Sequence, residues 1–343
     1  MKAIIFDEPG GLEKLKYVED FPTPEPKAGE VLLKVKASSL NHLDIWIRNG
    51  IAAYGTTFPH ISGCDISGVI EKTAGGASHW KKGDEVLIYP GITCGICEAC
   101  ESGRENLCKG YTIIGAGTNG GFAEYCLVPA KNLFRKPKNL SFEEAAAFPL
   151  VTLTSWHMLK TRANLKKGQS VLVLGASSGI GTAAVQIAKA EGAFVIATAG
   201  SADKLERVKK LGADELIDHN KEDILERVKK ITGGRGVDVV YEHIGPTTWD
   251  KSIKSLVKGG TLVTCGATTG PTVQTDLRYV YSRELSILGS LMGTRKELEA
   301  LLPLIESGKI KTPIDSTFPL KEVAVAEKKL ESRDFFGKIV VRV

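Results

Sequence analysis

Residues 170–181 read Ser-Val-Leu-Val-Leu-Gly-Ala-Ser-Ser-Gly-Ile-Gly, an apolar run that leads directly into a glycine-rich segment. The apolar run predicts a buried strand, and the residues that follow predict a helix reaching Ala190. Between them, Gly175 permits a tight turn, Gly179 lets the backbone approach a pyrophosphate, and Gly181 lets helix and strand pack closely. The amino end of the helix would face the phosphates. The stretch therefore predicts a dinucleotide-binding loop, and the alternative is a tight strand–helix turn without a ligand.

Beyond this loop, strand-like and helix-like segments continue to alternate as far as residue 288. Apolar runs rich in β-branched residues lie at 194–198, 237–241, 261–265 and 285–289. An amphipathic stretch at 202–211 predicts one of the helices between them. Continuous apolar strands that alternate with helices are typical of a parallel sheet covered on both faces. The sequence thus predicts a doubly wound α/β domain over residues 150–292.

The first 149 residues have a different character, with short strands between glycine and proline punctuation. Strands are expected at 1–6, 31–37, 67–70 and 85–89. After the α/β domain, the tail predicts a helix at 296–307 and a last strand at 338–343. We expect this strand to return to the first domain, which would then combine residues 1–149 with 293–343.

Bulk composition excludes several classes of function. The formal net charge is only +5 over 343 residues, and the basic residues are scattered among acids rather than gathered in the runs used on nucleic acid. No apolar stretch approaches the roughly 18 residues of a membrane span. The amino terminus resembles a first strand rather than a signal peptide. We therefore expect a cytoplasmic protein that binds neither nucleic acid nor membrane.

Seven cysteines do not fit a disulfide framework, because the number is odd and the chain is large. Four of them lie close together, at Cys94, Cys97, Cys100 and Cys108, in a lobe at about residues 91–110. Four thiolates complete a tetrahedral zinc site and leave no open position, so such a zinc is structural. The alternatives are an iron–sulfur cluster on the same ligands and a chance cluster of free thiols.

The end of the second predicted α/β strand bears on the choice of cofactor. An NAD site usually carries an acidic residue there, which binds the ribose 2′-hydroxyl. Here Gly200 and Ser201 follow the strand, and Lys204 lies one turn later. A small hydroxyl-bearing loop with a nearby cation suits a 2′-phosphate, so we favour NADP(H) over NAD(H). The alternative for Lys204 is a solvated helix residue.

Together, the four cysteines and the glycine loop resemble the medium-chain dehydrogenase/reductase superfamily, which includes zinc alcohol dehydrogenases and quinone oxidoreductases. Further landmarks are Gly63–Val69, Lys82–Val86, Gly120–Tyr125 and Gly337–Val340. The resemblance covers essentially the whole chain. It implies a GroES-like catalytic domain and a Rossmann domain, with the active cleft between them.

The resemblance breaks at the catalytic metal. The family uses three protein ligands and a nearby Glu, and the matching positions here are Asn41, Cys64, Leu150 and, for the Glu, Asp65. Asparagine is a poor zinc ligand and leucine is none, so too few ligands remain. The position of the family's proton-relaying hydroxyl is Leu43. The pattern from Asn41 to Asp44 instead resembles zinc-free quinone oxidoreductases, which normally lack the four-cysteine lobe.

Three residues are candidates for a catalytic role. Asn41 offers an amide donor near the nicotinamide, and its alternative is a buried structural amide. Asp44 either orients Asn41 or caps a helix. Cys64 is a candidate because it matches a ligand position, although a pocket thiol without a catalytic role is the preferred interpretation. No general acid stands out.

The resemblance also supplies candidates for cofactor contacts. The loop and strand-end candidates are Thr154, Gly175, Ser177, Ser178, Gly179, Ile180, Gly200, Ser201 and Lys204. Loops after later strands add Ile244, Gly245, Gly266 and Ala267. His42 matches a position at the pyrophosphate and His219 lies near the adenosine phosphate; a surface residue is the alternative for each. Leu291, Met292 and Lys338 complete the set, with packing as the alternative.

The leading hypothesis is an NADP(H)-dependent oxidoreductase of quinones, enones or bulky ketones without a catalytic zinc. One alternative is a zinc alcohol dehydrogenase with an atypical metal site, and another is a catalytically weak nucleotide-binding protein on the same fold. The apolar edge strand at 285–289 predicts pairing with a second copy, as a homodimer or homotetramer.

Overall fold

The computed structural model describes residues 1–77 and 79–343. The chain divides into two compact units. Unit 1 comprises residues 1–150, 294–306 and 313–343, and unit 2 comprises residues 151–293 and 307–312. The stretch 307–312, expected in the first domain, groups with unit 2 because the Gln186 side chain forms hydrogen bonds with the backbone of Lys311. Within the described ranges, no helix is both long and apolar enough to cross a membrane.

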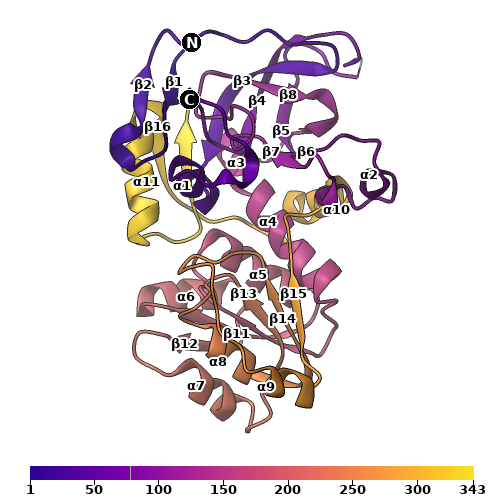
Figure 1. Cartoon of the computed structure of the whole chain (residues 1–343), viewed down its shortest axis with the longest axis vertical. Coiled ribbons are helices and arrows are strands. Elements are labelled where there is room, and N and C mark those ends of the chain that lie inside the picture. The colour runs from indigo at the N-terminus through magenta and orange to yellow at the C-terminus, as the bar shows by residue number, and fades with distance from the viewer. Residues whose placement is uncertain (78) are drawn as a thin grey trace. The chain divides into compact units, whose positions relative to one another are not determined.

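Unit 2 is a six-stranded, fully parallel sheet (Figure 1). Its strands, in spatial order, are β12 (Glu215–Asp218), β11 (Phe194–Ala199), β10 (Ser170–Val173), β13 (Val237–Glu242), β14 (Leu256–Thr264) and β15 (Ser286–Gly289). The chain order reverses between β10 and β13, which is the topological switch point where doubly wound sheets bind ligands. The predicted doubly wound fold is confirmed.

Helices connect these strands in the right order for parallel pairing. They are α5 (Gly179–Ala190), α6 (Ala202–Lys210), α7 (Ile224–Ile231), α8 (Trp249–Lys254) and α9 (Leu277–Ser282), and α4 (Pro149–Trp156) precedes the first strand, β10. A single π-helical stretch, η5 (His157–Arg162), continues α4. Four of these helices begin at polar side chains, because Ser178, Ser201, Asp223 and Asp276 each accept a backbone N–H of the first turn. Strand residues such as Leu172, Val240 and Leu262 are fully buried and form the core.

One strand begins earlier than the sequence predicts. We expected a strand at 261–265, whereas β14 begins at Leu256. Its first residue pairs with Val237, and the register then shifts so that Thr261 pairs with Val239. The intervening glycines hid this irregularity, because the apolar pattern resumes only after Gly260.

Unit 1 is built on a mainly antiparallel seven-stranded sheet. The path runs β16 (Ile314–Pro319), β17 (Lys338–Arg342), β3 (Glu30–Ser39), β4 (Asp65–Thr73), β5 (Glu85–Ile88) and β9 (Leu133–Arg135), and β8 (Tyr125–Pro129) also pairs with β3. Two small ribbons pair β1 (Ala3–Ile5) with β2 (Lys16–Val18) and β6 (Gly91–Ile92) with β7 (Thr112–Ile113). The last strand therefore does return to the first domain, as predicted.

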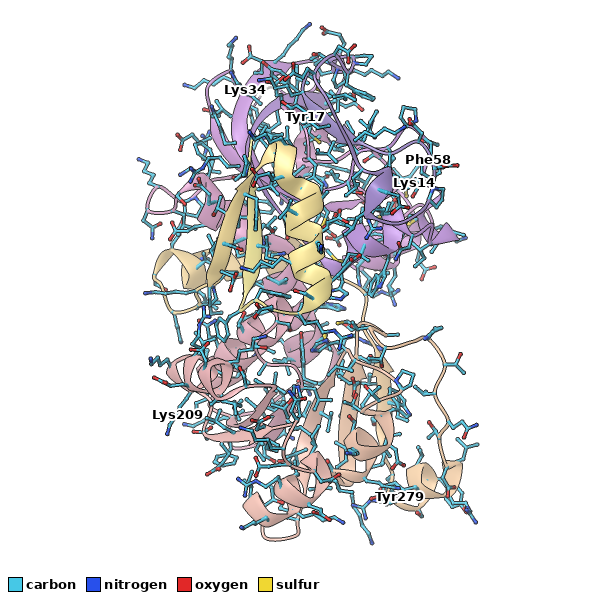
Figure 2. The ribbon with its side chains drawn as sticks, turned by 90° about the vertical axis from the view of Figure 1, so that its left-hand side faces the viewer. Lys14, Tyr17, Lys34, Phe58, Lys209 and Tyr279 are labelled. Carbon is cyan, nitrogen blue, oxygen red and sulfur yellow. The ribbon has the colours of Figure 1, made fainter. Side chains whose placement is uncertain are left out.

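Five α-helices belong to unit 1 in the described part of the chain. They are α1 (His42–Arg48), α2 (Glu98–Glu101), α3 (Phe142–Ala147), α10 (Arg295–Glu306) and α11 (Val323–Ser332). Short 3₁₀ turns are η1 (Leu12–Lys14), η2 (Ala52–Tyr54), η3 (Glu105–Leu107), η4 (Ala130–Asn132) and η6 (Leu320–Glu322). Figure 2 shows α11 lying along β16 and β17, where Val323, Ala326 and Leu330 enter a core shared with Ile339 and Val341.

A buried ion pair fixes α1 to α11. The Arg48 guanidinium donates from Nε to Glu327 Oε2 at 2.8 Å, and both side chains are at most 2% exposed. The remaining guanidinium nitrogens bind Gly10 O and the carboxylate of Glu331. Burial raises the pKa of Glu327, and the Arg48 charge lowers it in part. Both charges are therefore held by partners, which is the condition for tolerating them in a core.

We predict that Arg48→Met lowers the free energy of unfolding by about 3–5 kcal/mol, because it leaves the Glu327 charge buried and unpaired. The double variant R48M/E327M should recover most of this loss, since it removes both charges and retains side-chain volume. Urea denaturation of the two variants and the wild type measures this difference. Equal losses in the single and double variants would contradict the explanation.

Candidate active site

The glycine loop after β10 has the geometry that the sequence predicts. Gly175 adopts φ +52°, in the left-handed region. A Cβ on Gly181 would lie 2.4 Å from the Gly175 carbonyl oxygen, so only glycine fits there. The Ser178 hydroxyl donates to Gly175 O at 2.8 Å and accepts the Gly181 N–H at 3.1 Å. This closes the loop and starts α5, while Ser177, Gly179 and Ile180 lie in the same turn.

A second group of predicted cofactor contacts lies at the carboxyl end of β11. The Thr198 hydroxyl accepts the Gly175 N–H at 3.1 Å and lies 3.4 Å from His219 Nδ1. A Cβ on Gly200 would lie 3.0 Å from His219 Nε2, so His219 and Gly200 are neighbours. Ser201 caps α6, and Lys204 lies in the first turn of that helix. Burial lowers the pKa of His219, and the Lys204 charge lowers it further.

The remaining unit 2 candidates follow β13, β14 and β15. Gly245 has φ +98°, and Thr269 donates from its N–H and hydroxyl to the Ile244 carbonyl at 2.8 Å each. Gly266 and Ala267 belong to the loop that contains Thr269. The Thr154 hydroxyl, on α4, lies 3.8 Å from the Met292 sulfur, next to the exposed Leu291. The candidates on these three loops all lie at or beyond the carboxyl ends of their strands.

A hollow of about 530 Å³ lies at the opposite, amino-terminal edge of the sheet. It is lined by residues before or at the start of strands, among them Gln169, Arg235, Lys258 and Arg283. Arg235 is engaged by Asp238 through two hydrogen bonds. Because helices end at this edge, its cations compensate the negative ends of the helix dipoles. We therefore do not assign the hollow to the dinucleotide.

In unit 1, Asn41 and Asp44 close the start of α1. Asp44 Oδ2 accepts the Asn41 N–H at 2.7 Å, and Oδ1 accepts the Gly63 N–H at 3.0 Å. The Asp44 side chain therefore closes the start of the helix, which agrees with the cap alternative. Burial, helped by the Glu327 charge, raises the pKa of Asp44 to about 7, although both N–H donors lower it.

Lys338, at the start of β17, holds the centre of this site. Its ammonium donates to Leu40 O and Asn41 Oδ1 at 2.6 Å each, and lies 3.2 Å from Asp65 Oδ2. Lys338 is 3% exposed and Asp65 is fully buried. All three ammonium hydrogens thus have acceptors within unit 1, which agrees with the structural alternative for Lys338.

The Asn41 amide belongs to the same network. Its Nδ2 lies 2.9 Å from Asp65 Oδ2, 3.3 Å from Cys64 Sγ and 3.3 Å from Ser39 O. The other Asp65 oxygen accepts the Leu150 N–H at 2.8 Å. The four positions that match the family's metal site therefore do converge. Both amide hydrogens of Asn41 have internal acceptors, which agrees with the alternative of a structural amide.

These donors do not fit a catalytic zinc. Of the four converging positions, only the Cys64 thiol and the Asp65 carboxylate can ligate, and Asp65 is already bound to Lys338. Burial, and then the charges of Asp65 and Asp44, raise the pKa of Cys64 well above its ordinary value. A protonated thiol is a poor nucleophile. His42 lies at the start of α1 and stacks edge-on against Trp46, with ring centroids 6.2 Å apart.

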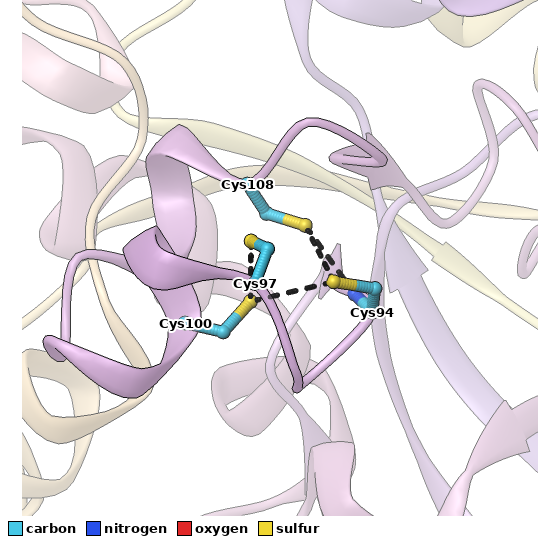
Figure 3. Close-up of side chains that lie close together, drawn as sticks. All are labelled: Cys94, Cys97, Cys100 and Cys108. Carbon is cyan, nitrogen blue, oxygen red and sulfur yellow. Dashed lines mark hydrogen bonds between the residues drawn. The ribbon is translucent and has the colours of Figure 1, made fainter.

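The four cysteines of the lobe converge on one point (Figure 3). Neighbouring sulfurs lie 3.4, 3.6 and 3.9 Å apart, and all four lie within 4.8 Å of one another. Tetrahedral zinc with bonds of about 2.3 Å requires sulfurs about 3.8 Å apart, so the set fits. Backbone N–H groups lower the pKa of Cys94, and the Cys100 N–H lowers that of Cys97 to about 6, whereas burial raises the pKa of Cys100 to about 11.

The lobe is tied to α10. Glu105 Oε1 accepts the Arg295 N–H, the first of the helix, at 2.6 Å. The Arg295 guanidinium donates to Lys131 O at 2.8 Å and stacks over the Phe134 ring. Lys131 in turn donates to Thr93 O, beside Cys94. A metal bound by the cysteines would therefore order this helix start as well as the lobe.

Comparison with known proteins identifies the family. A profile described as "Alcohol dehydrogenase GroES-like domain" matches residues 27–138, and one described as "Zinc-binding dehydrogenase" matches residues 179–307. The chain is a medium-chain dehydrogenase/reductase. This dehydrogenase/reductase is an enzyme of the oxidoreductase class, with GroES-like and Rossmann domains.

The similar proteins described next are named for three different activities. The chain is 33% identical to a crotonyl-CoA reductase of Streptomyces collinus over 95% of its own length and 81% of the relative's. It is 32% identical to a quinone oxidoreductase of Pongo abelii, over 96% and 94% of the two chains. The solved structure of an NAD-dependent alcohol dehydrogenase matches over 100% of both chains, with 44% identity and a TM-score of 0.96.

Two features of this dehydrogenase/reductase were missed from the sequence. Lys338 was expected only to complete the cleft, and its pairing with Asp65 has no local signal because 273 residues separate them. Glu242 was not singled out, although a carboxylate that ends an otherwise apolar strand is an unusual residue to bury.

We predict that Asp44→Asn changes the pH dependence of stability. Between about 3.9, the pKa of an exposed Asp, and about 7, the folded protein retains a proton that the unfolded chain has released. The free energy of unfolding of the wild type therefore falls as the pH rises through this window. The amide in D44N does not titrate, so denaturation between pH 4 and 7 should give a less negative slope for the variant.

Asp238→Asn is the control, because hydrogen bonds from Arg235 and Ser170 lower the pKa of Asp238 despite its burial. Its titration lies below the window, so its slope should match the wild type. Identical slopes for all three proteins would contradict the role of Asp44.

Proposed function

We propose that this enzyme is an NADP(H)-dependent reductase of conjugated carbonyl compounds, enones or quinones, and that it works without a catalytic zinc. The proposal rests on one observation. Where the family places its metal ligands, this chain has the Lys338 ammonium bound to Asn41 and Asp65. A bound zinc would have to displace that ammonium and would gain a single soft ligand, Cys64.

The shortage of metal ligands at these four positions bears on the substrate. Hydride addition to a simple ketone places the developing negative charge on one oxygen, which needs strong electrostatic stabilisation. Addition to an enone or quinone spreads that charge over a conjugated system and requires less of the protein. We therefore favour conjugated acceptors over simple ketones. The quinone oxidoreductase and crotonyl-CoA reductase among the relatives have names that agree with this choice.

In this proposal the bound dinucleotide supplies the hydride, and the protein supplies orientation and electrostatics. Unit 2 binds the pyrophosphate at the glycine loop, where the amino end of α5 is closed by Ser178. In unit 1, the Lys338 network fixes α1 and the Leu150 N–H rather than transferring a proton. The proton is assigned to water or to the substrate itself.

The preference for NADP(H) is supported by the segment after β11. Gly200 lies directly against His219 and the Asn220 amide, and a Cβ there would lie 2.9 Å from Asn220 Nδ2. An acidic side chain at this position would displace both neighbours. Ser201 and Lys204 offer a hydroxyl and a cation to a 2′-phosphate.

We also propose one structural zinc per chain, on Cys94, Cys97, Cys100 and Cys108. A closed set of four thiolates leaves no position for substrate, so this ion would stabilise the lobe and take no part in the reaction. Its chemistry is therefore separate from hydride transfer.

A homo-oligomer is the expected assembly, as a dimer or tetramer. β15 is an edge strand of the unit 2 sheet, and its Ile287 is 38% exposed. Leu277 and Tyr281, on α9, are 71% and 69% exposed. An unpaired apolar edge with apolar neighbours is typical of a surface that pairs with a second copy.

The deciding experiment combines metal analysis with a substrate screen. We expect one zinc per chain. We also expect NADPH to be oxidised at least about 10-fold faster with enones and quinones than with saturated ketones of similar size. A transition state that is about 1.4 kcal/mol less well stabilised reacts tenfold more slowly. Two zincs per chain and preferred oxidation of alcohols would instead indicate a zinc alcohol dehydrogenase. Tight NADPH binding without turnover on the whole panel would indicate a nucleotide-binding protein.

We predict that Lys204→Ala raises the Kd for NADPH about 10-fold or more, because it removes a charge-assisted contact to the 2′-phosphate. The Kd for NADH, which lacks that phosphate, should change less than about twofold. Lys209→Ala is the matched control, since Lys209 lies in the last turn of the same helix. Fluorescence titration measures all three proteins. Equal weakening of NADH and NADPH binding would contradict the assignment.

A further inference from the structure

Glu242, the last residue of β13, is fully buried. Its Oε1 accepts three successive backbone N–H groups, from His243 at 2.9 Å, Ile244 at 2.6 Å and Gly245 at 3.1 Å. Its Oε2 accepts the hydroxyls of Thr248 at 2.9 Å and Ser252 at 2.6 Å. Three consecutive amides form a nest of the kind that binds anions, and here a side chain of the same strand fills it.

His243, whose backbone N–H binds the Glu242 carboxylate, contacts the glycine loop with its side chain. Its Nε2 lies 2.9 Å from Leu174 O, and since a carbonyl only accepts, this nitrogen carries the hydrogen. Burial lowers the pKa of His243, so the ring is neutral. A Cβ on Gly175 would lie 3.1 Å from His243 Cε1, which places the ring directly beneath the loop.

The same backbone segment also binds the loop after β14. Thr268 donates its hydroxyl to His243 O at 2.9 Å, and Thr269 donates to Ile244 O. The carboxylate therefore lies where the loops after β10, β13 and β14 meet. β10 and β13 flank the switch point of the sheet, where a dinucleotide lies across the strand ends.

We propose that Glu242 is a positioning residue for the dinucleotide: it fixes the backbone of residues 243–245 and, through His243, the height of the glycine loop. This inference rests on dinucleotide binding by unit 2, but not on the preference for NADP(H) or on the substrate. The carboxylate acts through its neighbours and need not touch the cofactor itself. A residue that only links β13 to α8 would change the stability of the protein and leave dinucleotide binding unchanged.

Two variants of Glu242 test the inference. In Glu242→Gln, the amide oxygen can still accept backbone N–H groups, and the hydroxyls of Thr248 and Ser252 can turn to accept from its nitrogen. This variant keeps the shape of the loop and loses the charge. Glu242→Ala leaves the three N–H groups without an acceptor. The control is Asp238→Asn, at the other end of β13, where the carboxylate binds Ser170 N–H and Arg235.

The first readout is amide hydrogen exchange in the glycine loop, residues 174–181, without cofactor. We expect exchange there to be roughly 10-fold faster in E242A, with an intermediate rate in E242Q. D238N should leave this loop unchanged even if it lowers the melting temperature. Unchanged exchange in E242A, or equal acceleration in D238N, overturns the proposal.

The second readout is the Kd for both NADH and NADPH. We expect E242A to weaken both by about 10-fold or more, and E242Q to restore part of the loss, while D238N stays within about twofold of the wild type. An equal rise in the Kd for NADH and NADPH distinguishes the effect of Glu242 from the loss of a contact to the 2′-phosphate. A wild type that prefers NADH, or that reduces only ketones, contradicts the proposed function and leaves this comparison valid. Wild-type affinity retained in E242A overturns the inference.

Discussion

An ammonium group in the core of unit 1 holds together the ends of three neighbouring strands. Lys338 begins β17, Asn41 follows β3 and Asp65 begins β4, and their polar atoms meet within hydrogen-bond distance. A carboxylate this deeply buried requires a partner, and the strand pairing supplies it, since β17 pairs with β3 and β3 with β4. Through Asn41, the residue before α1, this pair of charges acts together with the Arg48–Glu327 pair to fix the position of that helix.

Each unit contains a buried carboxylate, and the two charges are stabilised in different ways. Asp65 is balanced by a full positive charge from Lys338. Glu242 is instead surrounded by backbone amides and hydroxyls, which stabilise its charge through oriented dipoles. The first arrangement places an ammonium group among the residues at the four positions that match the family's metal site. The second fixes the backbone of residues 243–245 at the carboxyl end of β13.

Much of the fold could be predicted because it depends on local pattern. The strands at 170–173 and 194–199 are short apolar runs, and the helix starts at Ser178 and Ser201 have sequence signatures. The four cysteines converge because their spacing almost requires it. The roles of Asn41 and Lys338 could not be predicted, because 297 residues separate the two side chains. Whether a buried polar side chain has all its hydrogen-bond partners within the protein depends on residues that are distant in the chain.

The contact between Glu105 and the first N–H of α10 has a consequence for the history of the family. The cysteine lobe contributes an acceptor to a helix that lies 190 residues away in the chain. A descendant that deleted the lobe would leave the Arg295 N–H without this acceptor, whereas the cap that Thr294 and Glu297 form with each other would remain. Loss of the lobe should therefore remove one hydrogen bond from the start of α10 and leave the helix itself in place.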